Sequence, residues 1–453
     1  MNYLLINPPY VMCGESVISP EAAMLPAGPL AIAASLRERG HQVEFKDYVF
    51  SQALPPAIDA TKYDGVLLAV HTLRNIPTAK RLLARVQGAS YVVAGGNLCS
   101  EIGITDFRSL GLQVDAVVRG YGHGVLRELE LKITGDIRAG RVDSRMPPAN
   151  PDLLDDATRL SYWSRSSARY PIIGPGGFGC AWSCNYCTAK MLSKRIERSL
   201  ADIEREVKIA RTHGYREIWC VDNLAFADRG LACEFDSIIE KEGLKWLGMT
   251  RAETVWATRN HLGHFRALTD IALGVEAPAR QLRELNRKAR HNNEELLRQA
   301  FSLLHQAGIS STAFVMLDIP GSQDDDYWAL IELLSRIRPG NVSWSFYNPP
   351  ASQAIGLGID LAQTGFYRWP LGFSVIPDTR VVQYAMIITG TWWMNWAPEN
   401  FFRESNEFGV EFDQGEIAQD TNARSVVGDL WSIWDYRPAA RFPIAPHVGR
   451  SLS

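Results

Sequence analysis

Three cysteines lie close together between residues 177 and 187. Cys180, Cys184 and Cys187 have the spacing C-x3-C-x2-C, and Gly177 and Gly179 precede the first of them. Thiolates bind iron–sulfur clusters, and a cubane 4Fe–4S cluster usually takes four of them. Three thiolates in one short loop can hold three irons of a cube and leave the fourth open to a substrate or cofactor. Glycine lets the backbone wrap closely around such a group because it has no Cβ.

A structural zinc site and three ordinary core cysteines are the two alternative interpretations. Zinc usually has four ligands, commonly as two separated pairs. No second C-x2-C pair or histidine pair with zinc-finger spacing occurs elsewhere in the chain. The scattered cysteines at positions 13, 99, 220 and 233 are interpreted as buried thiols, with a distant cluster ligand among them as the alternative. The total of seven cysteines, with three in one motif, predicts a reducing, cytoplasmic compartment.

Composition predicts a folded protein and excludes several partners. The 453 residues suffice for two or three domains, and 46% of them are hydrophobic. The net charge is -3, from 47 basic and 50 acidic residues, so we expect no nucleic-acid footprint and no membrane-surface patch. No apolar run reaches transmembrane length. The first residues lack the pattern of a secretion signal.

An α/β fold is expected because short apolar strands alternate with amphipathic helices. Residues 1–140 should form a doubly wound, Rossmann-like parallel sheet, whose ligands would lie at the carboxyl ends of the strands. A Pro-rich break makes residues 141–170 a linker. Residues 171–350 should form a partial (β/α)6 barrel. Residues 351–453 are rich in aromatic residues and are predicted to form a cap domain.

The expected elements have approximate bounds. In the first domain, strands are expected at 3–7, 41–47, 65–70, 91–95 and 115–119, and helices at 27–39 and 76–87. In the barrel, helices are expected at 200–212, 255–268, 294–307 and 325–337, and strands at 217–222, 246–249, 271–275, 311–317 and 342–347. Gly40 is expected to end the first helix as a C-cap.

The cysteine motif, with the aromatic Tyr186 just before its last cysteine, resembles the signature of the radical S-adenosylmethionine (SAM) superfamily. The resemblance covers roughly residues 171–350. It implies that the open iron binds the amino and carboxylate groups of SAM. It also implies that one electron from the cluster cleaves SAM to methionine and a 5′-deoxyadenosyl radical, which abstracts hydrogen from a substrate.

Four further residues match the superfamily pattern at strand ends. Asp222 follows the second strand, and Arg251 follows the third, where it would pair with the SAM carboxylate. Glu276 lies in a Gly-Val-Glu-Ala segment that resembles Gly-Val-Glu-Ser, and Asp318 begins an Asp-Ile-Pro-Gly segment that resembles Gly-Leu-Pro-Gly. The resemblance implies a catalytic set and a cofactor-binding set: Glu276, Asp222 and Asp318, and Tyr186, Asp222, Arg251 and Glu276. The plain alternatives are an ion pair for Arg251, a helix N-terminal charge for Glu276 and a loop cap for Asp318.

The first domain resembles the cobalamin-binding domain that precedes many radical SAM cores, through residues 5–9, 26–30, 39–43, 92–96 and 115–120. Asn97 follows the Gly-Gly pair where Pro-His is common, and Gly120-Tyr121-Gly122-His123 replaces Gly-Glu-Gly-Glu. No D-x-H-x-x-G motif supplies an axial histidine. Bound cobalamin therefore stays open, and the alternative is a domain kept for structure or for shaping the substrate pocket.

Two reactions fit this pattern. Size and domain order resemble the radical SAM diol dehydratases of aminoglycoside biosynthesis, which implies cobalamin-independent dehydration of a vicinal diol in a small natural product. A cationic aminosugar would need nearby carboxylates, for which Glu276, Asp222 and Asp318 are available. The alternative is cobalamin-dependent C-methylation in secondary metabolism. Both need an external electron donor or reductase partner. A non-catalytic protein with a structural or sensing cluster is the third hypothesis.

Overall fold

The structure is a computed structural model, which describes residues 1–9, 25–50, 55, 57–72, 75–138, 147–165, 169–177, 179, 180, 182, 184, 187, 198–277, 294–317, 319 and 322–346. These residues form two compact units. The first comprises 1–250 and 263–269, and the second comprises 251–262 and 270–346. The expected domain boundaries stay a prediction, and the expected cap domain lies outside the described residues.

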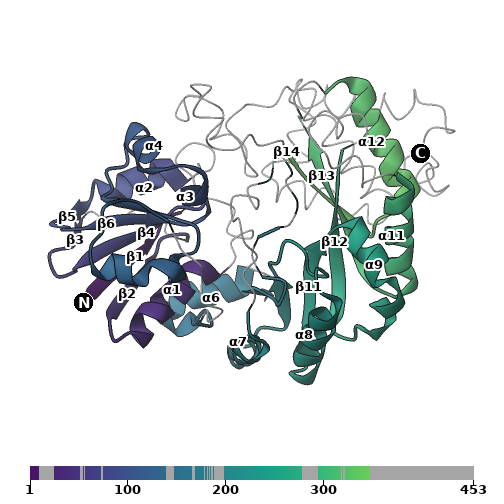
Figure 1. Ribbon diagram of the computed structural model, residues 1–453, viewed down its shortest axis with the longest axis horizontal. Helices are drawn as coiled ribbons and strands as arrows, with labels where there is room; N and C mark the ends of the chain where they lie inside the picture. The colour runs from purple at the N-terminus through teal and green to yellow at the C-terminus, as the bar shows by residue number, and fades with distance from the viewer. Residues whose placement is uncertain are drawn as a thin grey trace, which may run out of the picture. The chain divides into compact units, whose positions relative to one another are not determined.

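The first sheet contains six parallel strands in the order β2-β1-β4-β6-β7-β8. This order reverses direction along the chain, as in a doubly wound sheet, so the α/β prediction for the first domain is confirmed (Figure 1). A separate pair of short parallel strands joins β3 (Ile58–Asp59) to β5 (Val86–Gln87). The strands of the main sheet are β1 (Asn2–Asn7), β2 (Gln42–Asp47), β4 (Gly65–Ala69), β6 (Val92–Gly95), β7 (Ala116–Arg119) and β8 (Gly135–Arg138).

Helices cover both faces of the first sheet because successive residues of its central strands, which point to opposite faces, are apolar. Leu4 and Ile6 share one core with Leu82 of α2 and Phe107 of α4. The helix α1 ends at Glu38, and Gly40 adopts φ 82°, as expected for a C-cap. The helices are α1 (Ala27–Glu38), α2 (Ile76–Leu83), α3 (Asn97–Glu101), α4 (Ile104–Ser109) and α5 (Leu126–Glu130).

One helix of the first unit is shorter than expected. The sequence predicted a helix over 76–87, but α2 ends at Leu83. Val86 and Gln87 are in β5 instead, because they pair with β3. Tertiary pairing therefore overrides the helical spacing of the last turn.

The described part of the expected linker forms regular structure and hydrogen bonds. It contains a short 3₁₀ turn (Pro151–Leu153) and the helix α6 (Asp156–Arg165). Tyr162 of α6 donates to the Asp47 carboxylate at the end of β2 (2.7 Å), and Tyr170 of β9 donates to the Ala149 carbonyl (2.6 Å). Burial raises the pKa of Asp47 to about 6. The segment is thus fixed to the first sheet at one point and to the start of the second sheet at another.

The second sheet has the order β14-β13-β12-β11-β10-β9, with parallel ladders and helices between successive strands. Sequential order with helical crossovers is the arrangement of a (β/α) barrel, so the predicted barrel architecture is confirmed. Its strands are β9 (Arg169–Ile172), β10 (Glu217–Cys220), β11 (Lys245–Thr250), β12 (Leu268–Glu276), β13 (Ser310–Leu317) and β14 (Asn341–Phe346). Its helices are α7 (Leu200–Thr212), α8 (Arg229–Lys241), α9 (Ala252–Thr258), α11 (Glu294–Gln306) and α12 (Asp324–Ile337).

The prediction of one helix over 255–268 is wrong. The helix α9 ends at Thr258, a 3₁₀ segment covers Arg259–His264, and β12 already begins at Leu268. The cause is the buried Asp236 of α8, whose carboxylate accepts hydrogen bonds from the backbone N–H groups of residues 266–268. Among the described helices, none is long and apolar enough to cross a membrane.

Candidate functional site

The cysteine loop begins where β9 ends, at the carboxyl edge of the second sheet. Cys180, Cys184 and Cys187 are all partly exposed, and none of them is in a disulfide. The N–H of Cys187 donates to the Cys184 carbonyl (3.1 Å), which closes a tight turn over the C-x2-C pair. Three accessible, unoxidised thiols in one loop are a suitable donor set for a cubane iron–sulfur cluster.

A site for one metal ion is a different geometry. Within the described part of the chain, no three His, Cys, Asp or Glu side chains are grouped as the ligands of one ion would be. The thiolates of a cubane each bind a different iron, so they need not converge on one point.

The residues that lead into the cysteine loop, 173–177, form what we call the stem. The N–H of Gly174 donates to Asp222 Oδ1 (2.8 Å), and the N–H of Gly177 donates to Asp222 Oδ2 (3.0 Å). Asp222 is 0% exposed. A Cβ on Gly176 would lie 2.6 Å from Asp222 Oδ2 and 3.0 Å from the Leu224 carbonyl oxygen. Glycine is therefore needed here for close approach to Asp222.

We expect Gly176→Ala to reduce cluster assembly. The new methyl group would force the stem away from Asp222 at a cost of about 2 kcal/mol of overpacking. Iron and sulfide per chain after anaerobic reconstitution would fall well below the wild-type content. Gly28→Ala is the matched control, because a Cβ at Gly28 in α1 meets nothing within 4 Å. Equal iron content in the two variants would contradict the prediction.

Arg251 is the N-terminal cap residue of α9 in the second unit. It is 6% exposed, and its guanidinium forms a two-pronged contact with Glu253, with Nε–Oε2 at 3.1 Å and Nη2–Oε1 at 2.6 Å. A carboxylate therefore already faces the planar fork that was predicted to bind the SAM carboxylate. That role of Arg251 stays a prediction, and it would require SAM to share or replace the Glu253 contact.

Glu276 ends β12 in a strained conformation. Its φ is 66°, and a register shift in the ladder to β13 falls between Gly274 and Glu276. A left-handed backbone costs a residue with a Cβ about 1–2 kcal/mol, and such strain is concentrated at functional sites. This outlier supports the prediction that the Glu276 carboxylate has a chemical role.

Glu276→Gly separates strain from chemistry. Glycine adopts φ 66° without a Cβ penalty, so we expect the melting temperature to stay the same or rise. SAM cleavage should nevertheless fall at least about tenfold, because the carboxylate is lost. Glu276→Gln is the control that keeps the strain. Full activity of the glycine variant would remove Glu276 from the site.

Two other predicted residues, Tyr186 and Asp318, lie outside the described residues. Their assigned roles in SAM binding and catalysis stay predictions. Asp222 and the cysteines belong to the first unit, whereas Arg251 and Glu276 belong to the second.

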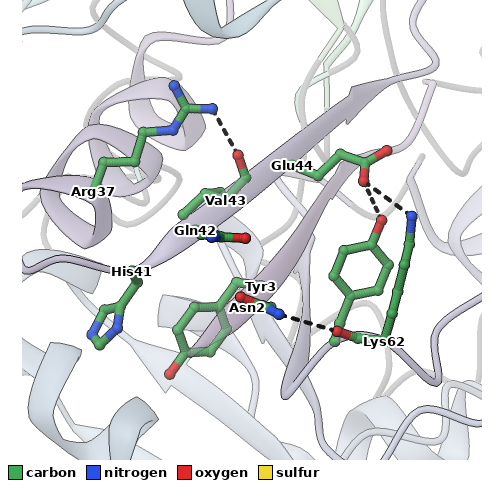
Figure 2. A pocket seen from close by; sticks show the side chains of 9 residues that line it. Asn2, Tyr3, Arg37, His41, Gln42, Val43, Glu44 and Lys62 are labelled. Carbon is green, nitrogen blue, oxygen red and sulfur yellow. Dashed lines mark hydrogen bonds and ion pairs between the residues drawn. The ribbon is translucent and has the colours of Figure 1, made fainter.

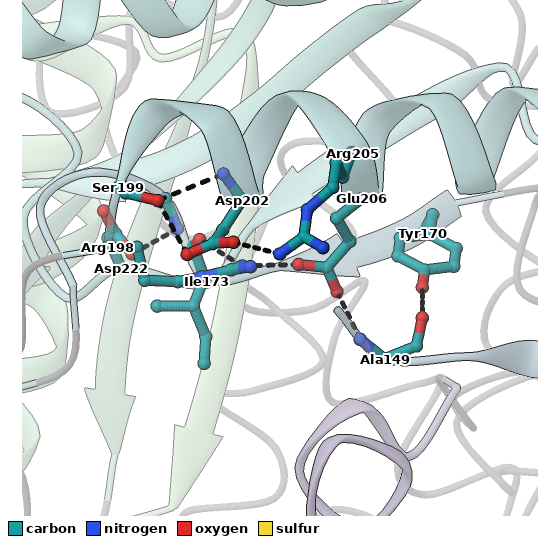
Figure 3. A network of polar contacts seen from close by, with 10 residues as sticks. Ala149, Tyr170, Ile173, Arg198, Ser199, Asp202, Arg205, Glu206 and Asp222 are labelled. Atoms are coloured by element: carbon teal, nitrogen blue, oxygen red, sulfur yellow. Dashed lines mark hydrogen bonds and ion pairs between the residues drawn. The ribbon is translucent and has the colours of Figure 1, made fainter. Parts of the chain in front are cut away.

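Sequence reasoning missed a buried ion pair behind the stem. Arg198 donates to Glu206 of α7, and their side chains are 0% and 3% exposed (Figure 3). The signal was present, because Glu206 interrupts the apolar face of α7 that Ile203, Val207 and Ala210 form. A carboxylate within an apolar stripe indicates a buried partner.

The carboxyl edge of the first sheet carries two partly buried histidines. His71 follows β4, where its N–H donates to Asn75 Oδ1 (3.0 Å), and burial lowers its pKa to about 4. His123 follows β7, and its ring nitrogens have no hydrogen-bond partner among the residues that the structure describes. Burial, reinforced by the Arg198 charge, lowers the pKa of His123 to about 4. Both imidazoles are therefore neutral at pH 7.

We expect these histidines to destabilise the apoprotein in acid. Their folded-state pKa values lie below the ordinary value of 6.5, so the unfolded chain binds protons more readily than the folded protein between pH 6.5 and 4. The free energy of unfolding is therefore unaffected above pH 6.5 and decreases as the pH falls toward 4. Each histidine can lower the free energy of unfolding by roughly 1.4 kcal/mol per pH unit in that range. Asp47 acts in the opposite sense, since its raised pKa favours the protonated fold below about pH 6.

His123→Phe isolates one histidine. The difference in unfolding free energy between this variant and wild type should change between pH 6.5 and 4, as measured by denaturant titration, while the Asp47 contribution cancels. His305→Gln, at an exposed position on α11, is the control and should leave the profile unchanged. Parallel pH profiles for wild type and His123→Phe would contradict the pKa shift.

Residues 175–334 match the radical SAM superfamily. No curated protein matches this sequence. Solved structures that are similar to this chain include the radical S-adenosylmethionine methyltransferase TsrM from Kitasatospora setae with cobalamin and a 4Fe–4S cluster bound. It has 15% identity and a TM-score of 0.58, covering 80% of this chain and 74% of that chain. The same enzyme with tryptophan substrate and a SAM analogue bound has 16% identity and a TM-score of 0.57, covering 79% and 77%.

These comparisons agree with the site geometry at two levels. The matched segment contains all three cysteines together with Asp222, Arg251 and Glu276, so the chain contains a radical SAM domain. A radical SAM domain implies a 4Fe–4S cluster and SAM as cofactors, as the sequence predicted. The likeness to TsrM extends over 80% of this chain and, at this identity, shows a shared fold.

Proposed function

We propose that the protein is a radical SAM enzyme that methylates carbon in a small molecule with the help of cobalamin. The observation that supports this most strongly is the fold likeness over 80% of the chain to a methyltransferase that holds both cobalamin and a 4Fe–4S cluster. The doubly wound first sheet has its ligand-binding edge at the carboxyl ends of its strands, where a corrinoid would lie. The substrate class and the external electron donor are part of the proposal.

In this proposal, each residue has a limited task. When bound, the cluster and SAM supply the reductive cleavage of a carbon–sulfur bond, and cobalamin supplies methyl transfer. The thiolates of Cys180, Cys184 and Cys187 hold three corners of the cluster. The strained Glu276 is available to orient SAM or substrate or to hold a proton, and Arg251 provides a cationic fork for a carboxylate.

A second candidate is cobalamin-independent dehydration of a vicinal diol, as in an aminoglycoside. One observation favours it. The loop after β7, where Gly120-Tyr121-Gly122-His123 replaces the common acidic pattern, has the Tyr121 hydroxyl and both His123 nitrogens enclosed by protein. A loop that is filled by its own side chains offers less open rim for a corrinoid.

The two candidates are separated by one titration. Anaerobically reconstituted protein is incubated with hydroxocobalamin, desalted and examined by absorbance, then supplied with SAM, dithionite and candidate substrates. Methylation predicts a protein-bound corrinoid spectrum and transfer of label from methyl-labelled SAM to product. Absence of bound corrinoid, together with 5′-deoxyadenosine and a dehydrated product, would favour dehydration instead. No SAM consumption under either condition would reject both.

A further inference from the structure

A recess of about 440 Å³ opens at the amino edge of the first sheet, the edge opposite to the one where a corrinoid would lie (Figure 2). Its walls come from the first residues of β1 and β2, the last turn of α1 and the turn before β4. All of the residues that line it belong to the first unit. Small-molecule sites commonly measure about 300–1,000 Å³, so the recess is large enough to take a ligand.

The buried residues that line the recess form an apolar, uncharged floor. Tyr3 and Val43 are 0% and 5% exposed. The Tyr3 ring meets the imidazole of His41 edge to face, with 5.6 Å between the ring centres. Burial raises the pKa of Tyr3 to about 12, so its hydroxyl stays protonated and donates to the Met1 sulfur at 3.3 Å. An apolar ring could therefore pack against this floor without meeting a charge.

Arg37 stands at one side of the recess, in the last turn of α1. Its Nη2 donates to the Val43 carbonyl at 2.8 Å, which fixes the direction of the guanidinium. Among the described residues, no carboxylate pairs with Arg37, and its other N–H groups make no hydrogen bond. Arg39, two residues later, differs because it holds Glu130 with two contacts of 2.6 and 2.8 Å. The guanidinium of Arg37 is thus oriented and available to two oxygens of an anion.

The facing side of the recess carries one carboxylate, which two ammonium groups share. Glu44 accepts a hydrogen bond from the Tyr63 hydroxyl. Its oxygens lie 2.9 Å from Lys46 Nζ and 3.5 Å from Lys62 Nζ. The Tyr63 hydrogen bond, followed by the lysines, lowers the pKa of Glu44 to about 2. Because this carboxylate is already balanced by its lysines, it would not repel an anion that paired with Arg37.

Gln42 lies between these two sides, as Figure 2 shows. Its side chain is exposed, and its amide makes no hydrogen bond with a described residue. An amide can donate to an anion without adding a charge of its own. The donors of Arg37, Gln42 and Lys62 therefore surround an apolar floor, which is the pattern of a small-molecule site with a few polar groups around an apolar surface.

We propose that this recess is a second ligand site, which takes a small organic anion whose carboxylate or phosphate pairs with Arg37 and whose apolar ring packs against Tyr3 and Val43. The site lies away from the carboxyl edges of both sheets, so the inference does not depend on the proposed methyl transfer. A ligand bound here would join the end of α1 to β2 and to the turn before β4. It would therefore stabilise the folded protein.

Benzoate and phenyl phosphate are the probes, because they carry the two candidate anionic groups on one ring. Benzamide lacks the charge, and inorganic phosphate lacks the ring. Binding to the full chain is measured at constant ionic strength by saturation-transfer nuclear magnetic resonance. At least one ring-bearing anion should bind with a Kd of about 1 mM or tighter, and about tenfold more tightly than benzamide and inorganic phosphate. The tighter of the two identifies the anionic group. Failure of both to bind, or equal binding of either control compound, would overturn the site.

Three variants locate the bound probe. Arg37→Gln removes the charge but keeps N–H donors, and it should weaken binding about tenfold or more because the charge-assisted contact is lost. Gln42→Trp should fill the recess and block binding without a change in charge. Arg39→Gln is the matched control, since it makes the same change of charge at the residue that pairs with Glu130. It should leave the affinity unchanged.

All three substituted side chains are exposed, so the variants should keep the wild-type melting temperature. Equal losses in Arg37→Gln and Arg39→Gln would show that general surface charge attracts the probe, and this would overturn the site. Unchanged affinity in a folded Gln42→Trp variant would overturn it as well. If Gln42→Trp does not fold, the comparison of the two arginine variants still decides. No cluster, SAM or corrinoid takes part in these measurements, so their failure is distinct from failure of the proposed function.

Discussion

Replacing any one of Cys180, Cys184 and Cys187 with alanine is expected to abolish SAM cleavage. Each thiolate would hold a separate iron, so a site with two remaining thiolates would no longer fix one corner of the cube. The four-iron signal in the reduced protein and the formation of SAM-derived products should both fall to background. The three thiols are only partly buried, so the free energy of unfolding of each variant apoprotein should lie within about 0.5 kcal/mol of the wild-type value.

Cys233→Ala is the control for this series. Cys233 is also partly exposed, but it lies on α8 outside the cysteine motif. It should retain wild-type iron content and SAM cleavage. A persistent four-iron signal in any of the three motif variants would show that another side chain replaces the missing thiolate. That result would contradict the assignment of the motif as the complete protein ligand set.

Gly95, which ends β6, and Gly96, which follows it, should respond very differently to substitution. Gly96 has φ 122°, and a Cβ there would lie 2.5 Å from the Val70 carbonyl oxygen. Alanine would be strained at this φ, and its Cβ would clash with rigid main-chain atoms. We therefore expect Gly96→Ala to lower the free energy of unfolding by about 3 kcal/mol or more. The displaced segment after Val70 carries His71, so under the proposed function corrinoid retention should fall as well.

Gly95→Ala provides the comparison within the same turn. A Cβ at Gly95 meets nothing within 4 Å, so the free energy of unfolding of this variant should lie within about 0.5 kcal/mol of the wild-type value. Denaturant midpoints of the two variants and their corrinoid content after desalting are the measurements. Equal stability of the two variants would mean that the turn after β6 is not packed against Val70 as described. Loss of stability in Gly96→Ala with full corrinoid retention would place the corrinoid elsewhere.

The α/β architecture was predictable because its signals are local. Apolar strands ended by glycine or proline, and a C-cap at Gly40, specify β-α units without reference to distant residues. The cysteine spacing likewise identifies the cluster loop from eight residues of sequence. These features depend on neighbours along the chain, so sequence alone carries them.

Other features depend on contacts that sequence spacing does not encode. The helix α8 was not predicted, because Asp236 occupies a position of its buried face where an apolar residue is normally expected. That same carboxylate binds the N–H groups of residues 266–268, which is why the helix predicted over 255–268 gives way to β12. Asp222 is a further example. Its position after β10 predicted contact with a cofactor, whereas its carboxylate accepts hydrogen bonds from the stem, a tertiary contact that the sequence does not encode.

The hydrogen bonds from Tyr162 to Asp47 and from Tyr170 to Ala149 have a practical consequence for dissecting the protein. A cut between residues 149 and 162 would separate the members of both pairs, and any cut between the two sheets would open the Ala31–Ile173 contact to water. A shortened polypeptide that ends before β9 is therefore expected to be prone to aggregation, and the corrinoid binding that the proposed function requires is best measured on a chain that contains both sheets.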